Sequence, residues 1–177
     1  MRITLIPIKI KNNSLLEYIK KQLELIFNSE ILIDNIEYDI QKNFNKSRNQ
    51  YYSTEIISNV IPLTEKLEGK VVLLVNVDLF VPVFTYLFGE AQFKGKLSIV
   101  STFRLYEEFY TGRTDDKLFY KRVFKEVLHE LGHNFGLRHC EDWNCVMHAS
   151  AGIEEVDVKG AYYCRKCEEV AKKNLIE

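Results

Sequence analysis

The side chains that bind transition metals most readily are confined to the last third of this chain. The four histidines are His129, His133, His139 and His148, and the four cysteines are Cys140, Cys145, Cys164 and Cys167. The residues before them contain neither type. Imidazoles and thiolates are common protein ligands of zinc. Their concentration in one segment needs a chemical reason, and it indicates that the C-terminal part folds around metal-ligating groups.

A long helix is predicted over residues 114–134, because capping residues precede it and Gly136 is placed to end it. Within this helix His129 and His133 are four positions apart, which places them about 40° apart around the axis, on one face. The apolar stripe lies roughly opposite, so the histidines are expected to face a cleft and not the main core. That stripe consists of Tyr120, Phe124, Val127, Leu128 and Leu131.

The third histidine of the candidate site follows the helix. A zinc ion with three protein ligands keeps a fourth position for water and lowers the pKa of that water to about 7. Gly136 allows a positive φ angle, so the chain can turn and His139 can approach the ion from another side. Glu130, offset by about 100° from His129, is placed beside the ion, where it can take a proton from the activated water. A chance pair of surface histidines would explain two of these residues, but not the whole set at these offsets.

The cysteines form two pairs, with four residues between Cys140 and Cys145 and two between Cys164 and Cys167. Four thiolates in two pairs match a closed, tetrahedral zinc site of the structural type. A disulfide pair and an iron–sulfur cluster are the alternatives. No secretory signal is visible in the sequence, and disulfides persist mainly in oxidising compartments. A structural zinc is therefore favoured.

The N-terminal half alternates between strand and helix patterns, which predicts a mixed α/β sheet. A helix is predicted at residues 14–27, with Ser14 as N-cap and Glu17 completing a capping box, and a second at 54–67, interrupted by Pro62. Residues 44–50 are polar and predict a loop. Strands are predicted at residues 3–8, 31–40, 71–77, 83–91 and 96–103.

Length and charge limit the class of protein and its partners. The 177 residues fit a single domain, 1–177, with the sheet and the helix in 1–136 and the remaining ligands in 137–177. A net charge of −1 gives no electrostatic reason to expect nucleic acid as a partner. The most apolar stretch, 71–88, contains Asp78 and Pro82 and is a poor membrane span. We expect a cytoplasmic protein, a monomer that binds neither nucleic acid nor membrane.

From His129 to Cys167 the sequence resembles the metzincin zinc peptidases and, more narrowly, the archaemetzincin family. The extended His-Glu motif from His129 to His139 is followed directly by Cys140, then by Cys-Val-Met at residues 145–147 and by the late cysteine pair. The resemblance implies a metzincin-like twisted mixed sheet with one antiparallel edge strand, at about residues 83–91. It also implies that Met147 forms a hydrophobic floor beneath the ligands.

The same resemblance implies two zinc ions. His129, His133 and His139 would bind the catalytic zinc, with Glu130 as the general base and later the general acid. Cys140, Cys145, Cys164 and Cys167 would bind the structural zinc. Since His139 and Cys140 are adjacent, the structural zinc is expected to hold the loop that carries His139 and Met147, and so to set the geometry of the catalytic site.

The implied activity is that of a zinc-dependent peptidase, which hydrolyses peptide bonds with a zinc-activated water. The alternatives are a two-zinc peptide-binding module with little or no catalysis and a zinc hydrolase of a non-peptide amide. Glu130 argues against the module, because zinc binding does not need it, and an edge strand favours extended peptides. Tyr162 or Tyr163 could supply an oxyanion donor, although a core or surface role is favoured for both. His148 is expected at the surface or in the cleft.

Overall fold

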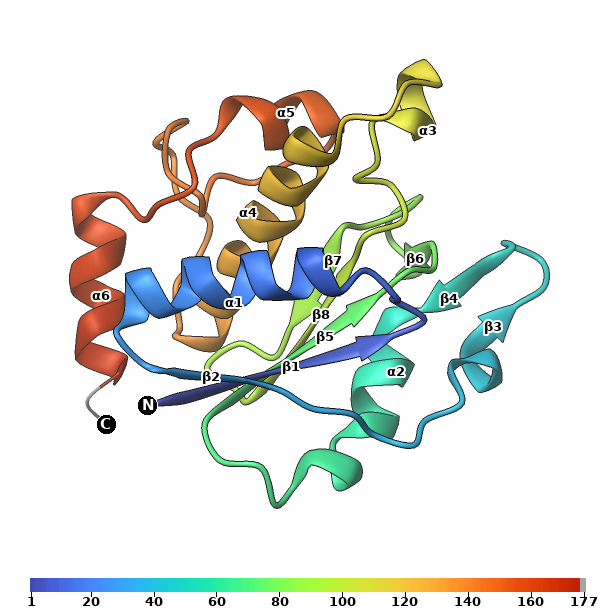
Figure 1. Cartoon of the computed structure of the whole chain (residues 1–177), viewed down its shortest axis with the longest axis horizontal. Helices are drawn as coiled ribbons and strands as arrows, with labels where there is room; N and C mark the ends of the chain where they lie inside the picture. Colours follow the sequence, from blue (N-terminus) through green and yellow to red (C-terminus); the bar gives the residue numbers. More distant parts are fainter. Residues whose placement is uncertain (176–177) are drawn as a thin grey trace.

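The computed structural model describes residues 1–175 and contains a five-stranded sheet in the order β2-β1-β5-β8-β7 (Figure 1). The first four of these strands run parallel, and β7 pairs antiparallel with β8 at one edge. This confirms the predicted mixed sheet with one antiparallel edge strand. The strands are β1 Arg2–Ile8, β2 Glu30–Ile33, β5 Lys70–Val75, β7 Gly89–Ala91 and β8 Leu97–Ser101.

Helices cover both faces of this sheet. Val72 of β5 packs in the cluster with α1 and α4, whereas its neighbour Val71 packs in the cluster with α2 on the other face. Successive strand side chains point to opposite faces, so a strand covered on both sides needs a continuous apolar run. Residues 71–75 are such a run and are all fully buried. The covering helices are α1 Asn13–Phe27, α2 Ser53–Val60 and α4 Asp116–Asn134.

A second, three-stranded sheet contradicts the loop predicted for residues 44–50. Strand β3 pairs antiparallel with β4, and β4 pairs parallel with β6. Only the turn between β3 and β4 matches the polar pattern, and it includes Asn49 with a φ of 54°. Strands this short are stabilised by their partners, which a local pattern does not contain. The three strands are β3 Phe44–Asn45, β4 Gln50–Tyr52 and β6 Leu79–Phe80.

Two elements in the first part of the chain begin or end at residues other than those predicted from the sequence. The Asn12 side chain accepts a hydrogen bond of 2.9 Å from the Leu15 N–H, so Asn12 and not Ser14 is the N-cap of α1. Both are good capping residues, and the pattern alone does not separate them. Strand β2 covers four residues and not 31–40, because only these four pair with β1.

Two larger differences lie around the middle of the chain, whereas β5, β8 and α4 differ from their predicted ranges by only one or two residues at an end. The helix predicted at 54–67 ends at Val60 and is followed by the 3-10 turn Pro62–Thr64, because proline has no N–H to continue the helix. The edge strand predicted at 83–91 is present only at its end, Gly89–Ala91. The Arg48 guanidinium donates to the carbonyls of Phe84 and Thr85 at 2.8 and 3.0 Å, which holds the preceding segment as a loop.

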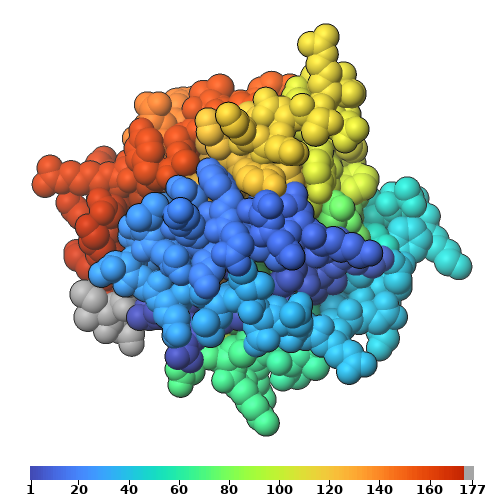
Figure 2. Space-filling model, in the orientation of Figure 1, coloured from blue at the N-terminus to red at the C-terminus, as the bar shows by residue number. Residues whose placement is uncertain are grey.

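The C-terminal part packs onto the same side of the sheet as α1 and α4. Figure 2 shows this part, in orange and red, lying against α1, in blue. Phe27 at the end of α1 and Ala171 of α6 line a common groove. Within residues 1–175 no helix is both long and apolar enough to cross a membrane. The remaining helical elements are η1 Ile40–Asn43, α3 Glu108–Thr111, α5 Ile153–Val158 and α6 Arg165–Leu175.

Candidate metal centre

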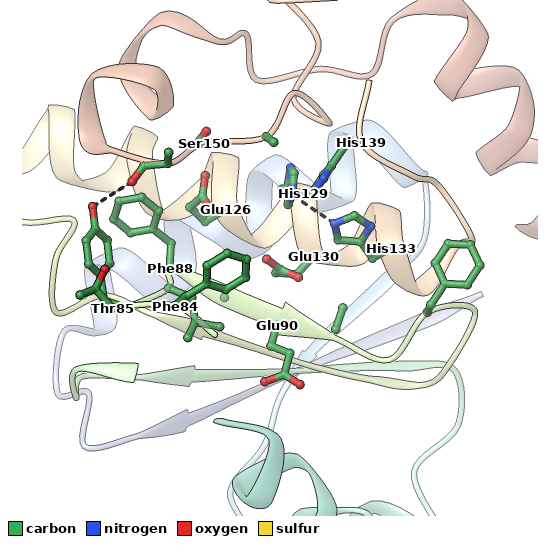
Figure 3. A pocket seen from close by; sticks show the side chains of 17 residues that line it. Phe84, Thr85, Phe88, Glu90, Glu126, His129, Glu130, His133, His139 and Ser150 are labelled. Atoms are coloured by element: carbon green, nitrogen blue, oxygen red, sulfur yellow. Dashed lines mark hydrogen bonds between the residues drawn. The ribbon is translucent and has the colours of Figure 1, made fainter. Parts of the chain in front are cut away.

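The three histidines of the motif converge at the bottom of a cleft (Figure 3). His129 and His133 lie on α4, and His139 lies on the segment that follows it. One ring nitrogen from each lies within 4.8 Å of the other two. The Nε2 atoms of His129 and His133 are 3.1 Å apart. The arrangement is a facial set of three imidazoles, as the sequence spacing predicts.

The end of α4 brings the third histidine to the other two. The N–H of Leu137 donates to the carbonyl of Gly132 at 2.9 Å, and Gly136 between them has a φ of 83°. This left-handed residue closes the helix and reverses the chain, which most side chains would resist. The Lys70 ammonium donates to the Asn134 carbonyl at 3.0 Å and satisfies one of the last helical carbonyls. Lys70 is the first residue of β5, so this hydrogen bond ties the C-terminal end of α4 to the sheet.

Backbone carbonyls orient two of the imidazoles. Nδ1 of His129 lies 2.8 Å from the Val146 carbonyl, and Nδ1 of His133 lies 2.8 Å from the Leu137 carbonyl. A carbonyl only accepts, so each Nδ1 carries the proton and each Nε2 presents a lone pair. Two such lone pairs at 3.1 Å need a cation between them and the third ring. The Nδ1–H groups donate hydrogen bonds to backbone carbonyls, and the Nε2 lone pairs point toward each other. Histidine ligands of zinc have this arrangement, so these residues fit a zinc ion.

The surroundings also keep these imidazoles neutral, as metal ligation requires. Burial lowers the pKa of His129 well below its ordinary value, and the nearby charge of Lys159 acts in the same direction. Burial likewise lowers the pKa of His133 and of His139. Neutral rings need no proton release before they bind a cation, so ligand binding at neutral pH is favoured.

Glu130 lies beside the three rings and is enclosed between α4 and the edge strand. Its exposed fraction is 5%, and it lines the cleft with the histidines. Burial, followed by the charge of Glu126, raises the pKa of Glu130 well above its ordinary value. A Cβ on Gly89 would lie 2.7 Å from the Glu130 side chain, so β7 approaches this carboxyl as closely as a glycine allows. The position suits a group that holds and moves a proton.

Met147 packs beneath the histidine-bearing turn of α4. It is fully buried, and a side chain at Gly132 would overlap its sulfur. Gly132 lies between His129 and His133 in the sequence, so the thioether occupies the space that any larger residue there would take. This placement agrees with the hydrophobic floor that the resemblance implies.

The four cysteines form a second group, outside the cleft. Their sulfurs all lie within 4.8 Å of one another, and all four thiols are unpaired. The Cys140 and Cys164 sulfurs are 3.8 Å apart, beyond a disulfide bond. Four convergent thiols from two chain segments fit a closed tetrahedral metal site. The Cys140 N–H donates to the Met147 carbonyl at 2.9 Å, so the loop with this cysteine is tied directly to the methionine.

The cleft has a volume of about 610 Å³ and runs between β7 and the segment after Met147. Its walls are mostly apolar, and the loop before β7 supplies most of the aromatic side chains (Figure 3). Ala149, Ser150 and Ala151 line the cleft from the C-terminal part. The Tyr86 hydroxyl donates to the Ala151 carbonyl at 3.1 Å and joins the two walls at one end. The apolar wall comprises Phe84, Tyr86, Leu87, Phe88, Ala91 and Phe93.

The sequence reasoning missed a buried ion pair at this site. The Lys159 ammonium lies 2.8 Å from Oε1 of Glu126, and the two side chains are only 1% and 4% exposed. Glu126 lines the cleft one helical turn before Glu130, so helical spacing could have identified it. Lys159 follows α5, and no sequence signal connects it to the motif.

Three residues left open by the sequence lie outside the cleft lining. Tyr163 is half-buried and its hydroxyl donates to the Leu128 carbonyl at 2.6 Å, whereas Tyr162 is exposed. His148 is half-buried, its Nδ1 lies 2.9 Å from the Cys140 carbonyl, and its ring lies against Trp143 with the centroids 4.1 Å apart and the planes tilted by 35°. His148 therefore stabilises the loop that contains Cys140 and Cys145.

Known proteins resemble this chain over most of its length. The family model described as Peptidase family M54 matches residues 13–173. The chain is 41% identical over 133 residues to an archaemetzincin of Pyrococcus horikoshii, which covers 75% of this chain and 71% of the relative. The crystal structure of archaemetzincin from Methanopyrus kandleri superposes with a TM-score of 0.85 at 29% identity, covering 100% of this chain and 96% of that one. A zinc-dependent peptidase from Methanocorpusculum labreanum gives 0.84 at 27% identity, with 96% and 99% covered.

Proposed function

Since the chain belongs to peptidase family M54, the archaemetzincins, and is a zinc-dependent metallopeptidase, we propose that His129, His133 and His139 hold its catalytic zinc. The observation that carries this assignment is the convergence of the Nε2 lone pairs of His129 and His133 at 3.1 Å, with His139 beside them. When bound, zinc supplies a Lewis acid that polarises the scissile carbonyl and makes water a stronger nucleophile near neutral pH.

Glu130 is the proton carrier of the proposed reaction. Its carboxylate accepts a proton from the attacking water and donates that proton to the leaving amine. Burial raises the pKa of this carboxyl, which makes it a stronger base than an exposed glutamate. The carboxyl lines the cleft, and the absence of a side chain at Gly89 lets β7 lie close to it.

The substrate is a peptide, and we propose that it binds in extended form along β7. The Phe88 carbonyl accepts a hydrogen bond from the Ser101 N–H at 2.7 Å, and the Gln92 N–H donates to the Leu97 carbonyl at 3.0 Å, so both residues bond to β8. In an antiparallel pair such residues alternate with residues whose N–H and C=O groups point away from the partner. Gly89 and Ala91 are of the second kind, so their backbone groups face the open edge beside the cleft. A peptide can add there as a further strand.

The cysteines are proposed to hold a second, structural zinc. This ion would fix the loop that contains both His139 and Cys140. In this loop the Cys140 N–H donates a hydrogen bond to the Met147 carbonyl. Loss of it should loosen His139 and thereby weaken the catalytic site. The test is Cys164→Ser, with zinc counted by mass spectrometry and peptidase activity measured. If the variant loses one zinc and keeps full activity and unchanged affinity for the other, the coupling is wrong.

Metal content and one variant test the assignment of the catalytic centre. Protein purified without chelator should contain two zinc ions per chain, and iron would overturn the assignment of the cysteines. Glu130→Ala should keep the zinc and lose at least about 100-fold in peptide cleavage, as expected for a general base. Equal cleavage by wild type and variant would favour a peptide-binding module. Cleavage restricted to small non-peptide amides would favour the second alternative.

We further propose that the protein acts as a monomer in the cytoplasm, with residues 1–177 as one domain. The four unpaired thiols support a reducing compartment, because oxidising ones favour disulfides. Light scattering on a size-exclusion column measures the mass in solution, and a dimer would contradict the monomer.

A further inference from the structure

The turn between β7 and β8 forms the edge of the cleft at one end. Figure 3 shows Ser150 and Thr85 at the opposite end of the cleft from His133. The turn lies at the His133 end, because the Lys94 N–H donates to the His133 carbonyl at 3.0 Å. Phe93 of this turn is 49% exposed and lines the cleft. A peptide that fills the cleft therefore passes over Phe93 at this end.

Arg138 lies at the same end and has no acidic partner. It directly precedes His139, which lines the cleft, and its guanidinium carbon is 5.4 Å from the centre of the Phe93 ring. At this distance the cation and the ring attract each other. Arg138 is exposed, and within residues 1–175 its guanidinium pairs with no carboxylate. Its N–H donors are therefore available to a ligand. We call residues 92–96 together with Arg138 the basic rim.

Hydrogen bonds to the end of α4 hold the turn of the basic rim in place. The side-chain amide of Asn134 donates to the carbonyls of Gln92 and Leu97 at 3.0 and 3.1 Å, which lie on either side of the turn. Phe93 is thus part of a fixed turn before any peptide binds. Arg138 rests on this ring and loses less side-chain freedom on binding than an arginine without such a contact.

We propose that Arg138, resting on Phe93, binds a carboxylate of the peptide substrate and thereby favours acidic peptides. The proposal rests on the peptidase function assigned above. A guanidinium binds a carboxylate through two parallel N–H···O bonds, which match the ligand in both charge and shape. The carboxylate is that of an aspartate, a glutamate or the C-terminus of the peptide. Because β7 runs toward the basic rim, a peptide added antiparallel to β7 brings its N-terminal part there, and a parallel one brings its C-terminal part.

No other side chain of the cleft attracts a carboxylate. The charged residues that line it are three glutamates, Glu90, Glu126 and Glu130. The Lys159 ammonium lies 2.8 Å from Glu126, is 1% exposed and is already paired. A substrate carboxylate therefore has two possible partners, the proposed catalytic zinc and Arg138. Lys94, which is exposed and follows Phe93 in the chain, adds a second positive charge to the basic rim.

Binding to zinc-loaded but inactive protein tests the basic rim. Glu130→Gln holoenzyme is titrated calorimetrically with alanine-based peptides that are blocked at both ends and carry one glutamate at successive positions. A further peptide has a free C-terminus and no glutamate. At least one of these peptides should bind about 3- to 10-fold more tightly than the neutral, blocked peptide, as expected for one charge pair at a partly exposed site. The preference should shrink in about 1 M salt, which screens exposed charges.

Arg138→Met in the same protein should remove most of the preference, measured as the ratio of the two dissociation constants. Arg113→Met is the matched control, because Arg113 is exposed, has no ion pair within residues 1–175 and lies beyond the other end of α4. It removes the same charge and should leave the ratio unchanged. Zinc is counted in each variant, since Arg138 adjoins His139. Lys94→Met changes no residue next to a proposed ligand and should lower the ratio by a smaller factor.

Each other outcome contradicts the proposal. A preference that Arg138→Met and Lys94→Met both retain would show that the carboxylate binds zinc instead. That result, equal affinities, no binding, or an equal loss in Arg113→Met would overturn the basic rim as a carboxylate subsite. Cleavage by the wild-type enzyme is scored separately. Cleavage without regard to acidic residues would reject the subsite alone, whereas no cleavage of any peptide would reject the peptidase function.

Discussion

At the scale of single residues, Gly89 sets the distance between the edge strand and Glu130. We predict that Gly89→Ala lowers kcat/KM by about 10- to 100-fold, because small displacements of a catalytic group have effects of this size. The added Cβ would lie 2.7 Å from the Glu130 side chain and 2.8 Å from the carbonyl of Ile99, and β8 cannot yield easily. Zinc content should stay unchanged, since the atoms nearest to the added Cβ belong to Glu130 and Ile99 and not to a histidine. Steady-state kinetics and metal analysis measure the two effects.

Gly112→Ala is the control for this substitution. Nothing lies within 4 Å of a Cβ at Gly112, and only its φ of 70° opposes a side chain. It should cost about 1 kcal/mol of stability and leave the kinetics unchanged. If Gly89→Ala behaves in the same way, the close approach of β7 has no role in catalysis.

The residues that the sequence predicts at the site are those related by local spacing. The helical offset groups His129 with His133, and the glycine turn brings in His139. Gly89 and Ser150 could not be predicted as part of the site, because only the packing of β7 and of the segment after Met147 places them against α4. Glu126 lies on the helix face of the histidines, but its partner Lys159 is a contact between distant segments.

At the scale of elements, Arg122 ties the active-site helix to its neighbours. Its guanidinium is 3% exposed, binds both oxygens of Asp157 at 2.7 and 2.6 Å, and lies 2.8 Å from Glu107. We predict that Arg122→Met lowers the free energy of unfolding by about 1.5–3 kcal/mol, because two partly exposed carboxylates lose their hydrogen bonds to a buried cation. Urea unfolding followed by circular dichroism measures this loss.

Arg165→Met supplies the matched comparison on α6. Arg165 is 92% exposed and pairs with Glu169 across one helical turn at 3.1 Å. Exposed pairs contribute about 0–1 kcal/mol, so this variant should unfold nearly as the wild type does. An equal loss in both variants would show that the burial of Arg122 adds nothing.

The sequence predicted elements correctly where the hydrophobic pattern is long. It failed where pairing with another strand determines whether a segment is a strand and where that strand ends. The continuous apolar run of β5 and the capped, periodic helix α4 contain their own signals. Strand β2 looked longer than it is, because its alternation continues past Ile33 while β1 pairs with only four of its residues. Strands β3 and β4 were missed because a two- or three-residue strand has too few positions to show a period.

At the scale of the whole molecule, the five strands of the main sheet contain no histidine or cysteine, whereas α4 and the C-terminal part contain all of the proposed metal ligands. Trp143 is the only tryptophan of the chain and lies between Cys140 and Cys145 in the sequence, with its ring against that of His148. We predict that a zinc chelator shifts the Trp143 fluorescence at concentrations that leave the far-ultraviolet circular dichroism nearly unchanged. The loop would lose its metal, while the strand pairing of β1, β5 and β8 needs none.

In His148→Ala the fluorescence shift should be smaller, because Trp143 has no imidazole ring to contact. In the wild type, added zinc should reverse the fluorescence shift. If fluorescence and circular dichroism change together at every chelator concentration, the prediction that the loop around Trp143 loosens before the sheet unfolds is wrong. Such a result would mean that the sheet itself depends on the metal.

The order of the chain has a consequence for protein synthesis. All five strands of the main sheet lie before residue 102, and the first of the proposed metal ligands is His129. A ribosome therefore delivers the complete set of strands before any histidine or cysteine is made, and domains fold as they emerge. We therefore expect zinc capture to be a late event in the maturation of the nascent chain. A cell short of zinc would accumulate polypeptides with a finished sheet and an unformed cleft, and resupply of the ion could activate this stored pool without new translation.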